Sequence, residues 1–315
     1  MLTALEDLLE DATAGDPISG LKWSRKTLDK LSQQLRAKGF RIGRNTIARL
    51  LRERNYALKG NRKAIASTHD PDRERQFRYS DQQRRAFEKA ANPVSSVDTK
   101  KKELIGRFKN AGRTWRRNAL SVCDHDFPSQ AVGKAIPYGM YDLTHNRGYV
   151  VVGIAHETPE FACAAIRRWW LAEGRRRYPA TGQVLIQADC GGANSNRSWR
   201  SPAGLQELAD AFTLTITLTH FPPSASKGNP IEHRMFNLIS ANWAGQPLVS
   251  YETVLKFIRT TRSAQGFRCV AWLDRRAYPT QVKLAPAQRA AINEHPHKLF
   301  PHWNYTIRPH AAACK

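Results

Sequence analysis

The stretch from His220 to His233, HFPPSASKGNPIEH, predicts the point at which a β-strand gives way to a helix. Before it, residues 213–219 (TLTITLT) alternate Thr with Leu or Ile, the period of two that is typical of a strand, and the two prolines end that strand. After it, Asn229 followed by proline suits the start of a helix, which we expect to run to about Trp243. Glu232 would then lie at a fixed place in the first helical turn.

Two interpretations of Glu232 are open from its position alone. It falls three residues after the expected cap at Asn229, so its side chain could complete a capping box and have no chemical role. However, Asp98 and Asp189 each stand at or near the end of an apolar run, VSSVD and VLIQAD. A charge in a buried strand is costly unless it is paired or bound to a metal. Two such aspartates and a helix-borne glutamate therefore suggest a metal-binding carboxylate cluster.

The sequence resembles the DDE-type transposases of bacterial insertion sequences, specifically the Rhodopirellula-type DDE domain of the ISAzo group. The resemblance covers nearly the whole chain. It is carried by segments beginning at Val97 (VDTKKKELIGRFKNAGRTWR), Asp124 (DHDFPS), Gly133 (GKAIPYGMYD), Ala188 (ADCGGANSNR), His220 (HFPPSASKGNPIEH) and Trp303 (WNYTIRP).

This resemblance implies an α/β fold with an RNase H-like mixed sheet, and it matches Asp98, Asp189 and Glu232 to the catalytic Asp, Asp and Glu of the family. Ninety residues separate the first two and 42 the last two, and a short second gap is typical of such enzymes. The implied reaction is cleavage at the element's ends followed by attack of the 3′-hydroxyls on target DNA. Carboxylate ligands suit two Mg²⁺ ions, or Mn²⁺, and two-metal phosphoryl transfer needs no protein nucleophile.

The charge of the chain indicates a polyanionic partner. The formal net charge is +23 over 315 residues, and residues 22–117 alone hold 28 Lys or Arg against 9 Asp or Glu. Double-stranded DNA, as element terminal repeats and as target, is the expected partner. We expect no membrane association, because no apolar run is long enough to span a bilayer and the first residues lack the regions of a signal peptide. The five scattered cysteines contain no C-x-x-C pair, which favours a reducing bacterial cytoplasm and, with DNA binding, association with the nucleoid.

Residues 1–64 are predicted to form a small all-α helix-turn-helix domain. We expect helices at residues 2–12, from a cap at Ser24 to about Lys38, and from Asn45 onward, with a tight link at residues 39–43. Four residues at the start and along the last helix would face the DNA major groove: Arg44, Asn45, Arg49 and Arg52. A basic helical packing module with a solvated charged face is the alternative.

Residues 65–92 are interpreted as a linker and a connecting helix that either follows DNA or packs on the catalytic domain. Residues 93–315 are expected to form the catalytic domain. Its first strand is expected to end at Asp98, and further strands are expected at 103–109, 149–155, 184–189 and 213–219. Helices are expected at 159–172, capped by Thr158, and at 203–212. Residues 110–148 would form an inserted hairpin or loop. A further helix capped by Ser250 and an apolar tail would close this domain.

Several further residues are candidates for the site. Lys100 and Lys101 follow Asp98, and Lys227 precedes Glu232, so each can contact a DNA phosphate, although a solvated surface role is as plausible for the first two. Asp124 and Asp126 are rival metal ligands, with an Arg salt bridge as the more ordinary explanation.

Three classes of function fit these patterns. The first is an active transposase, assembled on DNA as a homo-oligomer. The second is a catalytically inactive or truncated DNA-binding derivative that acts as a regulator. The third is another RNase H-like nuclease, against which the basic helix-turn-helix region argues.

Overall fold

The structure is a computed structural model that describes residues 1–10, 13–15, 22–24, 27–54, 56, 71–194, 200–222, 228–280 and 284–311. The chain divides into two compact units, Met1–Ile65 and Ala66–Lys315. In the described part of the chain, no helix combines the length and the apolar composition needed to cross a membrane.

In its described residues the first unit has three helices, which pack around one small core. They are α1 (Leu2–Glu10), α2 (Leu28–Ala37) and α3 (Arg44–Glu53), and a short antiparallel pair, β1 (Thr13–Gly15) and β2 (Lys22–Ser24), lies between the first two. The amphipathic pattern of the helices buries the same six side chains that form the core: Leu5, Leu8, Leu31, Leu35, Ile47 and Leu50.

Two details of this unit differ from the sequence prediction. Ser24 belongs to β2, and the cap of α2 is Thr27, whose Oγ1 accepts a hydrogen bond from the backbone N–H of Lys30 at 3.2 Å. Helix α3 begins at Arg44 after Gly43 rather than at Asn45. Both hydroxyl residues are suitable caps, so local preference alone does not choose between Ser24 and Thr27.

The second unit is built on one mixed sheet, which confirms the α/β prediction. Its strand order is β10-β11-β8-β7-β3-β5-β6-β9, and β4 pairs with β5 off this path. The strands are β3 (Val94–Thr99), β4 (Glu103–Ile105), β5 (Gly133–Asp142), β6 (Arg147–Gly153), β7 (Gln183–Ala188), β8 (Thr215–His220), β9 (Arg268–Asp274), β10 (Glu294–Pro296) and β11 (Asn304–Ile307). Strands β3, β7 and β8 run parallel, and β5 is antiparallel to β3 and β6.

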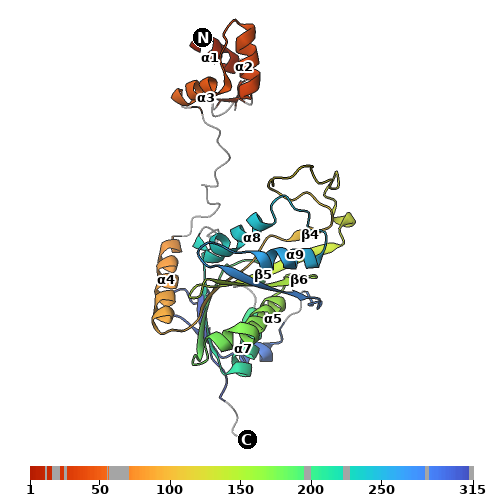
Figure 1. Cartoon of the computed structure of the whole chain (residues 1–315). Helices are drawn as coiled ribbons and strands as arrows, with labels where there is room; N and C mark the ends of the chain where they lie inside the picture. The colour runs from red at the N-terminus through yellow and green to blue at the C-terminus, as the bar shows by residue number, and fades with distance from the viewer. Residues whose placement is uncertain are drawn as a thin grey trace. The chain divides into compact units, whose positions relative to one another are not determined.

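Helices cover both faces of this sheet (Figure 1). One face packs on α5 (Pro159–Trp169) and α7 (Arg200–Phe212), and the other on η5 (Glu232–Phe236), α8 (Asn237–Asn242) and α9 (Tyr251–Thr260). The remaining helical segments are α4 (Arg73–Lys89), η1 (Pro128–Gln130), η2 (Trp170–Gly174), α6 (Arg175–Arg177), η3 (Gly192–Asn194) and α10 (Pro286–Ala290). The predicted caps Thr158 and Ser250 accept hydrogen bonds from the N–H groups of Phe161 and Thr253.

The second central strand was predicted in the wrong place. Residues 103–109 form a strand only at Glu103–Ile105, and the long strand beside β3 is β5, inside the region predicted as an insertion. Pro137 and the glycines of β5 are unfavourable in a strand by local preference, yet this strand is almost fully buried between β3 and β6, where packing outweighs that preference.

Helix α4 packs on the mixed sheet, which is one of the two alternatives predicted for the connecting helix. The amide Nε2 of Gln76 donates to the backbone carbonyl of His220 at 2.8 Å, and Phe87 packs with Val94 and Leu185. The C-terminal portion closes the sheet as expected, because β9 pairs with β6 and β11 pairs with β8.

Candidate active site

Asp98 and Asp189 lie side by side at the same edge of the sheet. Val97 of β3 is paired in register with Ala188 of the parallel strand β7, and each aspartate is the next residue along its strand. Because parallel neighbours end at the same edge, this register brings the two carboxylates close together. Their charges act on one another, since Asp189 raises the pKa of Asp98.

Glu232 reaches this edge from the helix that follows β8. The capping-box interpretation is not supported among the described residues: Asn229 Oδ1 accepts the N–H of Ile231, at 3.4 Å, rather than that of Glu232, and the Glu232 side chain makes no bond back to Asn229. Glu232 begins a π-helical turn, η5, and the helix ends at its cap Trp243, as predicted. The carboxylate is half-buried and is therefore available to the site.

A glycine in the sheet allows this helix to lie close to Asp98. Gly139 of β5 is the register partner of Asp98, and a Cβ built there would lie 2.4 Å from Met235 Cε and 2.6 Å from Phe236 Cε1. A side chain at this position would force Met235 and Phe236 to move, so the missing Cβ makes room for the first turns after Glu232. The packing of its helix on the sheet at Gly139 therefore fixes the position of Glu232.

An asparagine holds the carboxylate of Asp98. Asn229 Nδ2 donates to Asp98 Oδ2 at 3.0 Å, and Asn229 Oδ1 accepts from Ser96 Oγ at 2.6 Å, while the other oxygen of Asp98 accepts the N–H of Thr99 at 2.7 Å. Burial raises the pKa of Asp98 to about 8, and the charges of Asp189, Glu232 and Glu157 add to this effect.

A second asparagine holds Asp189 in the same manner. Asn194 Nδ2 donates to Asp189 Oδ1 at 3.0 Å, and its own Oδ1 accepts from Tyr138 Oη at 2.8 Å. His220 Nε2 fixes the backbone of this turn by donating to the Asn194 carbonyl at 3.0 Å. Burial raises the pKa of Asp189, and the hydrogen bond from Asn194 opposes that rise. The turn after β7 is therefore a support for the carboxylate.

Glu157 is a fourth carboxylate of the site, and the sequence patterns did not identify it. It acts on the pKa of both Asp98 and Asp189. Its oxygens accept from Lys102 Nζ at 2.7 Å and from the N–H of Ala193 at 3.3 Å. Burial alone would raise the pKa of Glu157, but these hydrogen bonds hold it below its usual value. Glu157 thereby links the segment after β3 to the turn after β7.

Lys100 lies inside the protein rather than on its surface. Its Nζ is 3.0 Å from a carboxylate oxygen of Glu103 and 4.5 Å from the centroid of the Trp243 ring. Burial lowers the pKa of Lys100, while Lys100 in turn lowers the pKa of Glu232, which burial raises. This burial argues against a direct phosphate contact by Lys100, and its charge instead balances that of the acids.

The other predicted residues lie as follows. Lys101 is exposed, and Lys227 is outside the described residues. Asp124 and Asp126 are exposed and do not join the buried acids. Within the described chain neither aspartate makes the Arg salt bridge given as the more ordinary explanation, and His125 Nε2 lies 4.0 Å from an oxygen of Asp124. Arg44, Asn45, Arg49 and Arg52 are exposed on α3, where Arg44 pairs with Asp29 and Arg49 with Glu53.

The three carboxylates are donors of the kind that a divalent metal ion needs. Within the described ranges, no group of three or more His, Cys, Asp or Glu side chains is already placed to hold a metal. The donors of Asp98, Asp189 and Glu232 are nonetheless all carboxylate oxygens, the ligands that Mg²⁺ and Mn²⁺ prefer. Their mutual repulsion and raised pKa values are what a bound cation would relieve.

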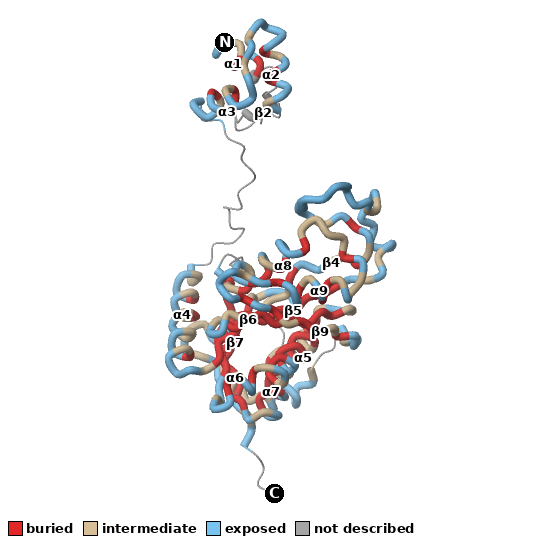
Figure 2. The backbone as a smooth tube through the Cα atoms, viewed as in Figure 1, coloured by how far each residue is buried: buried red, intermediate tan, exposed pale blue. Residues whose placement is uncertain are grey.

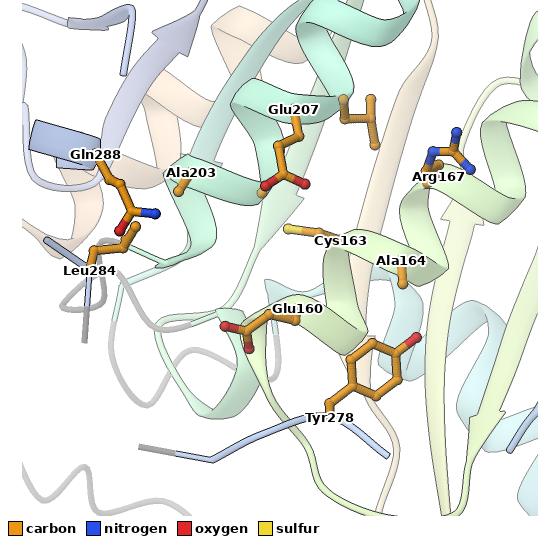
Figure 3. A pocket seen from close by; sticks show the side chains of 11 residues that line it. Glu160, Cys163, Ala164, Arg167, Ala203, Glu207, Tyr278, Leu284 and Gln288 are labelled. Atoms are coloured by element: carbon orange, nitrogen blue, oxygen red, sulfur yellow. The ribbon is translucent and has the colours of Figure 1, made fainter. Parts of the chain in front are cut away.

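A cavity of about 430 Å³ lies elsewhere, between α5 and α7, and none of the three carboxylates lines it. Figure 3 shows Cys163, Glu160 and Glu207 around this cavity. Burial raises the pKa of the Cys163 thiol to about 12, so the thiol stays protonated and is not an activated nucleophile. The acid cluster formed by Asp98, Asp189 and Glu232 at the edge of the sheet is the stronger candidate for an active site.

The family match of this chain is to a transposase domain. A family model described as the Rhodopirellula transposase DDE domain matches residues 4–309. No curated protein sequence matches the chain. Among solved structures, the chain is similar to the Mos1 transposase paired-end complex with left transposon end (14% identity, TM-score 0.43) and to the Mos1 mariner paired end complex with Mn (15% identity, TM-score 0.45). Both matches cover 82% of this chain and 69% of the other.

Proposed function

The chain belongs to the family of Rhodopirellula-type DDE transposases, and on this premise we propose that Asp98, Asp189 and Glu232 are the catalytic residues of a DNA transposase that cuts DNA at insertion-sequence ends and joins the 3′-hydroxyls to target DNA. One observation carries the assignment of the site. Asp98 and Asp189 lie at the ends of adjacent parallel strands, and Glu232 lies on the helix that follows β8. At this half-buried edge of the sheet, the three carboxylates influence one another's pKa. We infer that the catalytic unit is RNase H-like, and the order of its central strands and helices supports this.

The three carboxylates would hold Mg²⁺ or Mn²⁺. Such ions activate water or a 3′-hydroxyl and stabilise the leaving oxygen of an in-line displacement. The protein's own contribution is to orient the ligands: Asn229 and Asn194 hold one oxygen of Asp98 and of Asp189, and the packing against Gly139 fixes the helix that bears Glu232. Lys100 supplies a buried positive charge near Glu232.

We propose that the first unit recognises the element's terminal repeats. Arg44, Asn45, Arg49 and Arg52 are exposed on α3, whereas Ile47 and Leu50 of the same helix are buried in the core. A helix with one buried face and one exposed basic face suits entry into a major groove. Deleting residues 1–65 should abolish preference for element ends while leaving weak binding to any DNA, and an unchanged preference would contradict the assignment. Assembly as a homo-oligomer on DNA and a place in the cytoplasm with the nucleoid belong to the same proposal.

The catalytic assignment is tested with Asp98→Asn, Asp189→Asn and Glu232→Gln in the full chain. Each should abolish Mg²⁺- or Mn²⁺-dependent cleavage and joining of a DNA that carries the element's ends, because a neutral amide is a poor ligand for a divalent cation. DNA binding, measured without metal, should survive in all three. Asp124→Asn is the matched control, since Asp124 is exposed and is not among the groups that shift the pKa values of the three acids, and it should retain activity.

Two results would contradict this assignment. Cleavage that survives Glu232→Gln but is abolished by Asp124→Asn or Asp126→Asn would show that the third ligand lies elsewhere. Wild-type protein that binds element ends but cuts no DNA with either metal would instead favour a DNA-binding regulator.

A further inference from the structure

Residues 107–131, which connect β4 to β5, form an exposed segment that we call the basic arm. Every residue from Ala111 to Leu120 is exposed, and the side chain of Trp115 is fully so. Figure 2 shows the arm as a pale-blue loop region next to β4. Leu120 and Phe127 are also exposed on it. Large apolar side chains gathered on one surface segment usually mark a contact with a partner.

The cations of the arm have no acidic partner in the described chain. The arm carries five cations, Arg107, Lys109, Arg113, Arg116 and Arg117, and two acids, Asp124 and Asp126. Within the described residues none of the five cations makes an ion pair, and Arg116 donates to Thr114 Oγ1, at 3.0 Å. On α4, by contrast, Arg78 and Arg84 pair with acids of the same helix. Unpaired arginines beside an exposed tryptophan are suited to bind an anionic partner.

The root of the arm is fixed to the element that follows Glu232. The N–H of Gly245 donates to the carbonyl of Ala111 at 2.8 Å, and the N–H of Gly106 donates to the carbonyl of Leu248 at 2.9 Å. A Cβ on Gly112 would lie 2.5 Å from Ala244 Cβ, so the two segments are in close contact. The arm therefore begins at a defined place relative to the helix that carries the catalytic glutamate.

A cavity of about 220 Å³ lies at this root. Lys101, Lys102 and Lys109 line it together with Asn110 and Asp126. Lys102 also pairs with Glu157, which acts on both catalytic aspartates. Lys102 therefore contacts Glu157 of the site and also lines a cavity at the root of the arm, where two further ammonium groups could contact a phosphate backbone beside the acids Glu103 and Asp126.

We propose that the basic arm holds the DNA strand next to the cleavage site, with Trp115 stacked on an unpaired base and Arg113, Arg116 and Arg117 on phosphates. Every base offers a face for stacking, so an aromatic side chain among cations binds single-stranded DNA without sequence preference. A second copy of the chain is the less suitable occupant, because it carries the same net charge of +23. This proposal depends on the proposed function in one respect only, which is the position at which the DNA strand is cut.

The test measures binding of the full chain, without divalent metal, to two labelled DNAs: a duplex with a short single-stranded extension and the same duplex with blunt ends. Trp115→Ala should weaken binding to the extended duplex roughly 10- to 100-fold and leave the blunt duplex nearly unchanged. Trp115→Phe should restore most of the affinity, since a phenyl ring also stacks. The triple change of Arg113, Arg116 and Arg117 to Gln should reduce the salt dependence by about 0.7 in log–log slope for each phosphate that is no longer neutralised.

Arg78→Gln is the matched charge control, because Arg78 is exposed but already paired with Glu74, and it should leave the slope unchanged. Wild-type affinity of Trp115→Ala for the extended duplex would overturn the proposal. So would a change in the mass of the DNA-free assembly, by light scattering, with DNA affinity intact, since the arm would then bind protein. The measurements involve no metal and no cleavage, so a failure of the catalytic assignment would leave these results unaffected.

Discussion

The acid cluster and the basic arm differ in how far contacts within the protein hold their side chains in place. At the acid cluster, oxygens of Asp98 and Asp189 accept hydrogen bonds from Asn229 and Asn194, and the surrounding groups are largely buried. On the arm, side chains such as Trp115 are exposed, and its cations have no ion-pair partner within the described residues. The two regions are nevertheless close in sequence, since the arm starts nine residues after Asp98.

This difference separates stability from binding. Groups of the acid cluster are held in place before any ligand arrives, so changing them should alter the free energy of unfolding as well as activity. Groups of the arm would gain their contacts only from a partner, so changing them should alter binding and little else. Four predictions test this contrast.

The largest effect that we expect is a pH dependence of stability that comes from Asp98. Burial and the neighbouring acids raise its pKa from 3.8 to about 8, and each pKa unit corresponds to about 1.4 kcal/mol. The folded state therefore keeps a proton that the unfolded state loses, so this contribution is complete below the unfolded pKa and is lost as pH rises through about 8. Relative to wild type, Asp98→Asn should gain stability steadily from acid to neutral pH.

Denaturant unfolding in EDTA, followed by tryptophan fluorescence over that pH range, measures this difference. Asp124→Asn should show no comparable trend, because Asp124 is exposed. A difference between wild type and Asp98→Asn that stays constant with pH would mean that Asp98 is charged in the folded protein.

The next effect concerns the two asparagines. Asn229→Ala and Asn194→Ala should each reduce strand cleavage and Mn²⁺ affinity about 10- to 100-fold, because groups that orient metal ligands have effects of that size. Titration calorimetry with Mn²⁺ measures the affinity without DNA. Asn242→Ala is the control, since its amide donates to Phe257, Thr260 and Thr261 and to none of the acids in the described chain. Unchanged Mn²⁺ affinity in both variants would show that the asparagines serve folding alone.

A third prediction concerns the glycine under the Glu232 helix. Gly139→Ala should lower the free energy of unfolding by about 1–3 kcal/mol, because the added methyl overlaps Met235 and Phe236. Cleavage should fall as well, since Glu232 would be displaced. Gly182→Ala provides the comparison, because a Cβ there meets nothing within 4 Å. Equal stability of the two variants in thermal unfolding would contradict the close packing.

The smallest effect should be that of the arm on stability. Trp115→Ala and the triple arginine change should alter the free energy of unfolding by no more than about 0.5 kcal/mol, as is usual for exposed positions. Denaturant unfolding without DNA measures this. A larger decrease would show that the arm packs on the protein and would remove the contrast with the acid cluster.

Much of the site follows from local sequence signals. Asp98 and Asp189 end apolar runs, and Asn229 followed by proline fixes the start of the helix with Glu232. Glu157 was missed because it ends no apolar run and contributes only through tertiary contacts with Lys102 and Ala193. One signal was present: it lies just before the cap of α5, after a strand that runs parallel to β3 and so ends at the same edge.

The fold was predictable where packing and local preference agree. Strand β5 was missed because Pro137 and Gly139 are unfavourable in an isolated strand. The structure uses both: the Pro137 carbonyl accepts the N–H of Lys100 at 2.9 Å, and Gly139 makes room for the Glu232 helix. These reasons are contacts with distant segments, which local patterns do not contain.

The π-helical turn at Glu232–Phe236 bears on how the chain tolerates changes in length. A π-turn holds one residue more than an α-turn, with hydrogen bonds from i to i+5. Removal of a single residue after Glu232 would therefore let the turn relax to α-helix, and α8 would keep its packing position on the sheet. Relatives with one residue fewer in this turn would then present the same glutamate. Related sequences are therefore better aligned here by the strands of the sheet than by counting residues from Glu232.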